Sequence, residues 1–395
     1  MSIPAAVNLC NMSETICRLC NFQGIEIVFE LAAMPRWNHR LLRTNELSSD
    51  RSVNLQIYGC PCCGFVSMPV ILADNYYDDY VNVSSMSPQA KSFQTEQALD
   101  FVNGFGLVGQ KILEIGCGDG FFLLSMQNAG ALCFGIEPSS DQRKLARDRG
   151  FKVEEGFLSG NRILDDAPFD AFVTRQVFEH VKDMRDFLMA IRRNIRVGAV
   201  GLVEVPNLDK LVSEARFFDF IPEHVNYFLP ATLRIAVQLA GFEVLEVCPV
   251  QDGEALRALV RLPESTDCRS LPLRVESLRS EVAVFLSRCK ALKKKVALWG
   301  AGGKGLSMMA VADVSQIQLL VDSDPGKAGL YTPVSHLRVC PTTELAVQDI
   351  DVVIILAPAY EREIARTLRV DLGFSGQIVL AGSNFVVIEA NDLLP

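Results

Sequence analysis

The sequence contains no apolar run of the roughly 18–20 residues that a membrane-spanning helix needs, so we expect no membrane association. It also lacks a basic excess, since 38 Lys and Arg against 47 Asp and Glu leave a net charge of −9. This balance argues against nucleic acid as a partner, although a local pocket can still bind an anionic small molecule. The N-terminus shows no basic region followed by an apolar core, which predicts a cytoplasmic protein without a signal peptide.

Cysteine is scarce over most of the chain, which argues against a disulfide-stapled scaffold. Of the 12 cysteines, five crowd between residues 17 and 63. Two Cys-x-x-Cys pairs can place four thiolates around one tetrahedral zinc ion, and no histidine or carboxylate completes an open site. We therefore predict a structural zinc held by Cys17, Cys20, Cys60 and Cys63. Cys62 should point away, and buried free cysteines are the alternative.

The length of 395 residues predicts two or three domains. From about residue 90 to 262, and again from about 295, apolar strand-like runs alternate with helical stretches. This alternation predicts an α/β fold with mostly parallel sheets covered on both faces. A polar stretch with two prolines, 263–273, marks a boundary. The predicted domains are 1–75, 76–265 and 266–395.

Ten apolar runs are typical of strands. They cover 111–116, 131–138, 169–175, 199–206, 242–250, 255–262, 295–300, 317–324, 351–358 and 377–383. Three helical stretches, 119–130, 140–150 and 183–198, each end at glycine, as helices often do.

The motif LEIGCGDG follows the strand at 111–116 and opens a helix. Its three glycines permit a tight turn and the close approach of a ligand to the backbone. These are Gly116, Gly118 and Gly120. Glu114 in the strand gives the E-x-G-x-G-x-G motif of class I methyltransferases, and Glu137 ends the next strand, where it can bind ribose hydroxyls. The loop carries no basic residue for a triphosphate. We predict an S-adenosylmethionine site; a dinucleotide or no ligand are the alternatives.

Nearly the whole chain resembles the three-domain sugar C-methyltransferases. The resemblance is carried by the domain order, the tyrosine–serine segment 77–87, the Glu223–His224 pair and the GAGGKG…VDSDPGKAG pattern. It implies a zinc-binding N-terminal domain, a class I methyltransferase domain and a C-terminal Rossmann-like domain. It also implies S-adenosylmethionine as methyl donor and a nucleotide-linked 4-keto deoxysugar, methylated at carbon 3, as acceptor. In this family the exit of the strand at 169–175 contacts cofactor and acceptor, and we assign Gln176 there to the cofactor.

The chain has only four histidines, and two of them follow glutamate in the methyltransferase domain. Methylation of a carbon beside a ketone requires removal of an α-proton, for which a neutral imidazole is a suitable base. By resemblance, His224 matches the general base, Glu223 its neighbour, and His180 and Tyr80 other active-site positions. The family commonly has tyrosine where this chain has Ile221, and this difference favours an oxygen acceptor as the alternative.

The C-terminal domain carries Gly300-x-Gly302-x-x-Gly305 after a strand, with Asp322 at the end of the next. This spacing is that of a dinucleotide-binding fingerprint, which favours NAD when taken alone. The resemblance instead implies a domain without a redox role, and Lys304 suits an anionic phosphate. We expect it to hold the nucleotide portion of the substrate.

The sequence thus predicts a monomeric methyltransferase that acts on a small molecule, most simply a sugar nucleotide methylated at carbon. Transfer to an oxygen of a sugar or another precursor is the first alternative. A nucleotide-binding protein with an inert methyltransferase domain is the second.

Overall fold

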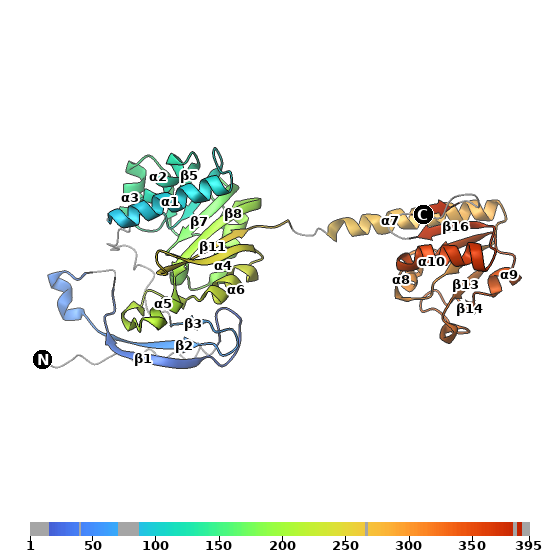
Figure 1. Ribbon diagram of the computed structural model, residues 1–395, viewed down its shortest axis with the longest axis horizontal. Helices are drawn as coiled ribbons and strands as arrows, with labels where there is room; N and C mark the ends of the chain where they lie inside the picture. The colour runs from blue at the N-terminus through green and yellow to red at the C-terminus, as the bar shows by residue number, and fades with distance from the viewer. Residues whose placement is uncertain (1–15, 39–40, 70–86, 265–267, 382–384, 389–395) are drawn as a thin grey trace. The chain divides into compact units, whose positions relative to one another are not determined.

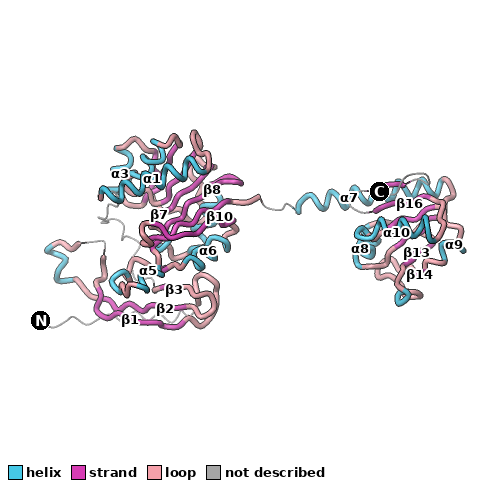
Figure 2. The backbone as a smooth tube through the Cα atoms, in the orientation of Figure 1, coloured by secondary structure: helices cyan, strands magenta, loops and turns pink. Residues whose placement is uncertain are grey.

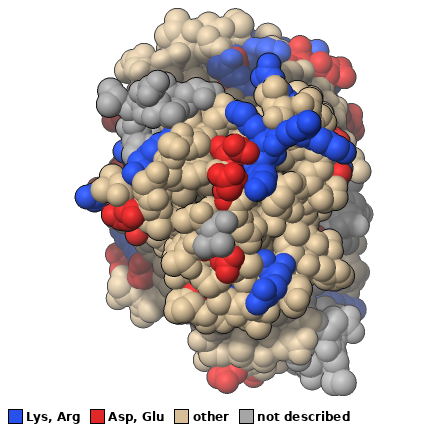
Figure 3. Space-filling view, turned by 90° about the vertical axis from the view of Figure 1, so that its right-hand side faces the viewer, with Lys and Arg blue, Asp and Glu red and all other residues tan. Residues whose placement is uncertain are grey.

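The computed structural model describes residues 16–38, 41–69, 87–264, 268–381 and 385–388 (Figure 1). It divides the chain into two compact units, Met1–Ser265 and Thr266–Pro395. The expected boundary at residue 75 and the candidate Tyr80 lie outside the described residues. Within these ranges, no helix combines the length and apolar character that crossing a bilayer takes. On the face drawn in Figure 3, basic and acidic side chains are interspersed among uncharged ones.

A seven-stranded sheet forms the centre of the first unit (Figure 2), in the order β10-β11-β8-β7-β4-β5-β6. The strands are β4 Lys111–Ile115, β5 Leu132–Glu137, β6 Lys152–Glu155, β7 Phe169–Arg175, β8 Ile195–Pro206, β10 Glu243–Val250 and β11 Ala255–Arg261. The five neighbouring strands β8, β7, β4, β5 and β6 run parallel. Strand β11 is antiparallel to both β8 and β10. The α/β fold expected from the strand–helix alternation is confirmed.

Helices cover both faces of this sheet because alternate strand residues point to opposite sides. Ile112 belongs to a core with residues of α1, α2 and α3, whereas Leu113 belongs to a core with residues of α4 and α6. The helices are α1 Pro88–Gly104, α2 Phe121–Asn128, α3 Ser140–Asp148, α4 Met184–Asn194, α5 Leu208–Ser213 and α6 Pro230–Leu239. Short 3-10 turns lie at η3 Phe178–His180 and η4 Phe217–Asp219.

The helix expected over 183–198 does not end at a glycine. It ends at Asn194, whose fully buried amide donates to the carbonyls of Ala190 and Arg162. The next residue already starts β8, and Gly198 lies within that strand. The prediction was wrong because side-chain capping by Asn194, rather than a glycine, ends the helix.

A second sheet in the first unit was not expected from the sequence, where the first 75 residues show little periodicity. Its order is β1-β2-β3-β9. The strands are β1 Glu26–Met34, β2 Val53–Gly59, β3 Val66–Ser67 and β9 Asn226–Tyr227, and a 3-10 turn, η1, covers Thr44–Ser49. Its core joins Leu55 and Ile57 of β2 to Leu208, Phe220 and Tyr227, all distant in sequence. The N-terminal residues therefore pack on the segment that carries the Glu223–His224 pair.

The second unit has a six-stranded sheet in the order β14-β13-β12-β15-β16-β17, parallel except for β17. The strands are β12 Val296–Trp299, β13 Leu319–Asp322, β14 Val339–Pro341, β15 Val352–Ile355, β16 Gln377–Ala381 and β17 Phe385–Ile388. The helices are α7 Leu271–Ala291, α8 Gly303–Val311, α9 Glu344–Val347 and α10 Glu361–Arg366, with a π turn, η8, at Thr367–Asp371. Further 3-10 turns are η5 Cys268–Ser270, η6 Pro325–Lys327 and η7 Pro358–Tyr360.

Candidate active site

The three glycines of the loop between β4 and α2 have two structural roles. All three have positive φ angles. A Cβ on Gly116 would lie 2.4 Å from Val177, and a Cβ on Gly120 would lie 3.0 Å from that of Ala146, so these two allow close packing. A Cβ on Gly118 would meet nothing within 4 Å. Gly118 is therefore the position that leaves open space for a ligand.

Two buried carboxyl groups border this loop. Glu137, at the end of β5, accepts hydrogen bonds of 2.9 Å from the amides of Gly118 and Ser139. Burial raises the pKa of Glu137, and burial raises that of Glu114 to about 8. Glu114 Oε2 is buried and has no hydrogen-bond partner within the described residues. An open backbone at Gly118 beside an acidic strand end fits the adenosyl group of S-adenosylmethionine.

The exit of β7 carries the predicted Gln176, which has a φ angle of 54°. Its amide Nε2 lies 3.4 Å from Glu204 Oε1. Glu204, fully buried in β8, also accepts hydrogen bonds from Gln97 at 2.6 Å and from Arg175 at 3.1 Å. Glu204 is not predicted by the sequence, because one glutamate in an apolar strand forms no motif. Its burial and its three hydrogen-bond partners make it the anchor of this exit.

Two histidines meet just beyond this exit. The rings of His180 in η3 and His224 lie 4.8 Å apart, nearly perpendicular. His180 Nδ1 lies 2.8 Å from the carbonyl oxygen of Glu223. Because a carbonyl only accepts, this nitrogen carries the proton. The Glu223 carboxylate accepts from the amide of Asn38 at 2.6 Å, so Glu223 links both histidines to the N-terminal residues.

Tyr227 is the nearest described phenol to the Ile221 position. Its hydroxyl accepts a hydrogen bond of 3.2 Å from the Ile221 amide, and its ring lies 6.2 Å from that of His224. Burial raises the pKa of Tyr227. The hydroxyl therefore supports the backbone before His224.

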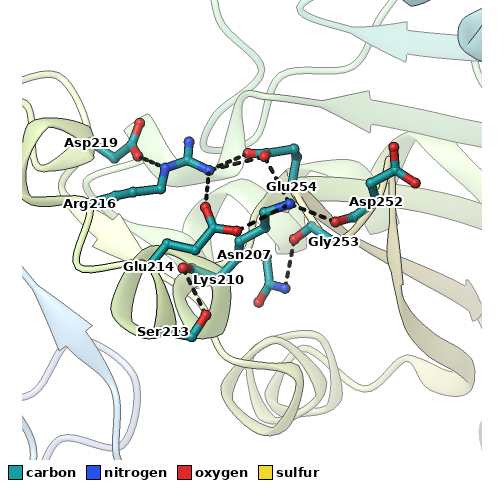
Figure 4. Close-up of polar contacts among 9 residues, drawn as sticks. All are labelled: Asn207, Lys210, Ser213, Glu214, Arg216, Asp219, Asp252, Gly253 and Glu254. Atoms are coloured by element: carbon teal, nitrogen blue, oxygen red, sulfur yellow. Dashed lines mark hydrogen bonds and ion pairs between the residues drawn. The ribbon is translucent and has the colours of Figure 1, made fainter.

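The segment before His224 is also held by ion pairs (Figure 4). Arg216 contacts Asp219 at 2.6 Å and Glu254 at 2.8 Å, and Lys210 contacts Glu254 at 3.1 Å. Asn207 donates to the carbonyl of Gly253 at 2.9 Å. These contacts tie α5 and η4 to the β10–β11 turn.

The four predicted cysteine ligands come together. Their sulfur atoms all lie within 4.8 Å of one another, with 3.7 Å between Cys17 and Cys63 and 3.6 Å between Cys20 and Cys60. Zinc–sulfur bonds of about 2.3 Å in a tetrahedron require sulfur separations of about 3.8 Å, so the cluster fits zinc. Cys62 is exposed.

Both cysteine pairs have the same local backbone. In each pair, the amide of the first cysteine donates to the carbonyl of the residue five positions later, at 2.9 Å. The carbonyl of the same cysteine accepts from the amide of the residue four positions later, also at 2.9 Å. The residue four positions after the first cysteine is Asn21 in one pair and Gly64 in the other, and both have a positive φ angle. Phe65, which ends the second pair's turn, contacts Phe228, and Phe228 stacks on Phe178 of η3 at 5.1 Å. The cysteine cluster thus supports the strand pair β3–β9 beside His224.

The loop of the second unit repeats the contacts of the first. Asp322, at the end of β13, accepts from the amides of Ala301 at 2.7 Å and Asp324 at 2.9 Å, as Glu137 does in the first unit. Lys327 forms an ion pair of 3.0 Å with Asp322. These amides and Lys327 hold the pKa of Asp322 below its usual value, although burial opposes them.

Two family models and one full-length relative match this chain. Residues 90–247 match the family model of a methyltransferase domain, and residues 260–381 match that of a C-methyltransferase C-terminal domain. The C-methyltransferase NovU of Streptomyces niveus is 23% identical over 96% of this chain and 98% of its own length. Over nearly its whole length the chain is thus similar to a C-methyltransferase.

Other relatives match a smaller share of the chain. The ubiquinone biosynthesis O-methyltransferase of Glaesserella parasuis serovar 5 is 26% identical over 38% of this chain and 67% of its own. A solved S-adenosylmethionine-dependent methyltransferase from Mesorhizobium loti covers 42% of this chain and 99% of its own at 15% identity, with a TM-score of 0.34. The family match and the strand order confirm the predicted class I methyltransferase fold, and the methyl donor is S-adenosylmethionine.

Proposed function

We propose that this enzyme methylates a carbon of a nucleotide-linked keto-deoxysugar through an enolate, with His224 as the base. The observation that carries the proposal is the pair of imidazole rings, His180 and His224, 4.8 Å apart beyond the exit of β7. Val177, at that exit, adjoins Gly116 of the glycine loop, so the base and the cofactor loop border the same strand end.

S-adenosylmethionine, when bound, supplies an activated methyl group on a sulfonium. His224 accepts the proton from the carbon beside the substrate carbonyl, and the electron pair of that bond moves to the carbonyl oxygen. The resulting enolate makes the carbon nucleophilic, which carbon methylation requires. Glu223 is proposed as the neighbour of the base, and His180 and Tyr80 are proposed as further active-site residues.

The remaining site residues are proposed as supports. The cofactor contacts would come from Glu114, Gly116, Gly118, Gly120, Glu137 and Gln176. The four-cysteine cluster would hold one structural zinc, because its sulfur separations suit a tetrahedral ion and all four positions are filled by protein.

The second unit is proposed to hold the nucleotide portion of the substrate. Its support is the loop at Ala301, which contacts Asp322 as Gly118 contacts Glu137. A redox use of NAD is less favoured, because Lys327 already pairs with the carboxylate that would bind a ribose. Ile221, which stands where the family commonly has tyrosine, favours methyl transfer to an oxygen. The match of residues 260–381 to a C-methyltransferase C-terminal domain favours transfer to a carbon.

Isotope exchange tests the proposal directly. A nucleotide-linked 4-ketosugar is incubated with the enzyme in heavy water without methyl donor, and deuterium at the carbon beside the carbonyl is read by mass spectrometry. We expect enzyme-dependent exchange, and methyl label at the same carbon once the donor is added. His224→Asn should lower both rates by about 100- to 10,000-fold, the usual contribution of a general base.

His336→Asn is the matched control, because His336 is exposed in the second unit. It should retain both rates. Label on an oxygen, or exchange that His224→Asn leaves unchanged, would overturn the carbon mechanism or its base.

A further inference from the structure

Glu179 is a buried carboxylic acid that the mechanism above does not use. It lies in η3, between Phe178 and His180, and is only 1% exposed. Its Oε1 lies 3.9 Å from His180 Nε2. Its Oε2 is buried and has no hydrogen-bond partner among the described residues. Its backbone carbonyl accepts from Val225, the residue after His224, at 2.9 Å.

The proton on His180 decides what Glu179 can do. Because His180 Nδ1 donates to the Glu223 carbonyl at 2.8 Å, Nε2 of the neutral ring carries no proton and can only accept. Nε2 is the ring nitrogen that lies 3.9 Å from Glu179 Oε1. A separation of 3.9 Å exceeds a hydrogen bond, and such contacts in ligand-free active sites often shorten when the site is filled.

The surroundings of Glu179 favour its neutral form. Burial, together with the nearby carboxylate of Glu204, raises the pKa of Glu179 to about 8. The titratable groups that face it are His180 on the same turn, Glu204 from β8, and His224 and Tyr227 from the chain at β9. A neutral carboxyl has a proton to donate, and an unpaired carboxylate buried here would be costly.

We propose that Glu179 is a positioning residue that, as a neutral acid, donates a hydrogen bond to His180 Nε2. His180 then bridges Glu179 and the Glu223 carbonyl. Glu223 precedes His224, and the Glu179 carbonyl accepts from the amide of Val225, which follows it, so the bridge holds both chain neighbours of His224. The bridge keeps His180 neutral and fixes the backbone that carries the base, so that His224 alone accepts the substrate proton. This inference rests on the function proposed above.

Glutamine distinguishes a neutral donor from an anion. The amide of Glu179→Gln still donates but does not titrate, whereas Glu179→Ala removes the donor. With a ketosugar nucleotide and labelled donor, we expect Glu179→Gln to stay within about threefold of the wild type at pH 7. Glu179→Ala should lose about 10- to 100-fold, the scale of a misplaced catalytic group. Exposed Glu96→Gln in α1 is the control for a lost glutamate charge.

The pH profile follows from the same reasoning. As pH rises through about 8, Glu179 loses its proton and with it the donor, so wild-type turnover should fall on the alkaline side. Glu179→Gln should lack that fall. A glutamine variant as slow as the alanine variant, or an alanine variant as fast as the wild type, would overturn the proposal.

A second measurement is independent of the acceptor. Nitrogen-15 spectra of the labelled histidines should show His180 neutral with its proton on Nδ1 near pH 7, unchanged in Glu179→Gln. A cationic His180 that becomes neutral in Glu179→Gln would mean an ion pair and refute the donor role. If no ketosugar is methylated but these spectra hold, the proposed substrate fails and the role of Glu179 stands.

Discussion

Substitution of Gly118 by valine should separate cofactor binding from folding. A Cβ at this position meets no atom within 4 Å, so the added carbon itself does not clash with the fold. The φ angle of 52° still disfavours an L-residue, which costs about 1–2 kcal/mol of stability. The side chain would instead fill the space that we propose for the adenosyl group. Crowding of this kind costs about 1–3 kcal/mol, or roughly 5- to 150-fold in affinity for S-adenosylmethionine.

Gly109→Val is the matched control for this change. Gly109 has a φ angle of 73° and likewise no atom within 4 Å of an added Cβ, but it precedes β4 rather than following it. Urea unfolding should show similar losses for both variants, and calorimetry should show weakened S-adenosylmethionine binding for Gly118→Val alone. Wild-type affinity in Gly118→Val would refute the placement of the cofactor on this loop.

Three further changes test the cysteine cluster, a buried acid and the loop before the base. Metal analysis of the wild type should give about one zinc per chain, because four thiolates suit a tetrahedral ion. Replacing Cys17 and Cys60 together by serine should abolish this zinc and destabilise the first unit, while Cys62→Ser, an exposed control, should retain it. Full zinc in the double variant would exclude the site. Glu114 has a raised folded-state pKa of about 8, so the folded state holds its proton to higher pH than the unfolded chain, and stability should fall as pH rises from about 4.5 to about 8. Glu114→Gln should flatten that fall in urea titrations at several pH values, and an unchanged slope would contradict the burial of a neutral acid. Arg216→Ala should cost about 1 kcal/mol of stability, because it removes several partly exposed ion pairs, and the loss should shrink in high salt; a salt-independent loss would point to packing instead.

Local patterns in the sequence predict several parts of this protein. Strand–helix alternation predicted the α/β fold because a two-sided sheet needs apolar runs separated by amphipathic helices. The glycine motif predicted a turn that only glycine readily forms, and Gly116, Gly118 and Gly120 all have positive φ angles. The spacing within each Cys-x-x-Cys pair likewise predicted two turns that present thiolates on one side.

The contacts between residues far apart in the chain depend on the tertiary structure. The second sheet pairs β3 with β9, although more than 150 residues separate Ser67 from Asn226 in the chain. No pattern in either two-residue strand indicates that pairing, because its stability comes from packing against the other strands. The same holds for the proposed roles of Glu179 and Glu204, which follow from the burial of these side chains and from the residues that they contact. A single glutamate within an apolar stretch of sequence indicates neither property. Local sequence set the turns and strands, and the non-local packing of the apolar core set the position of His224.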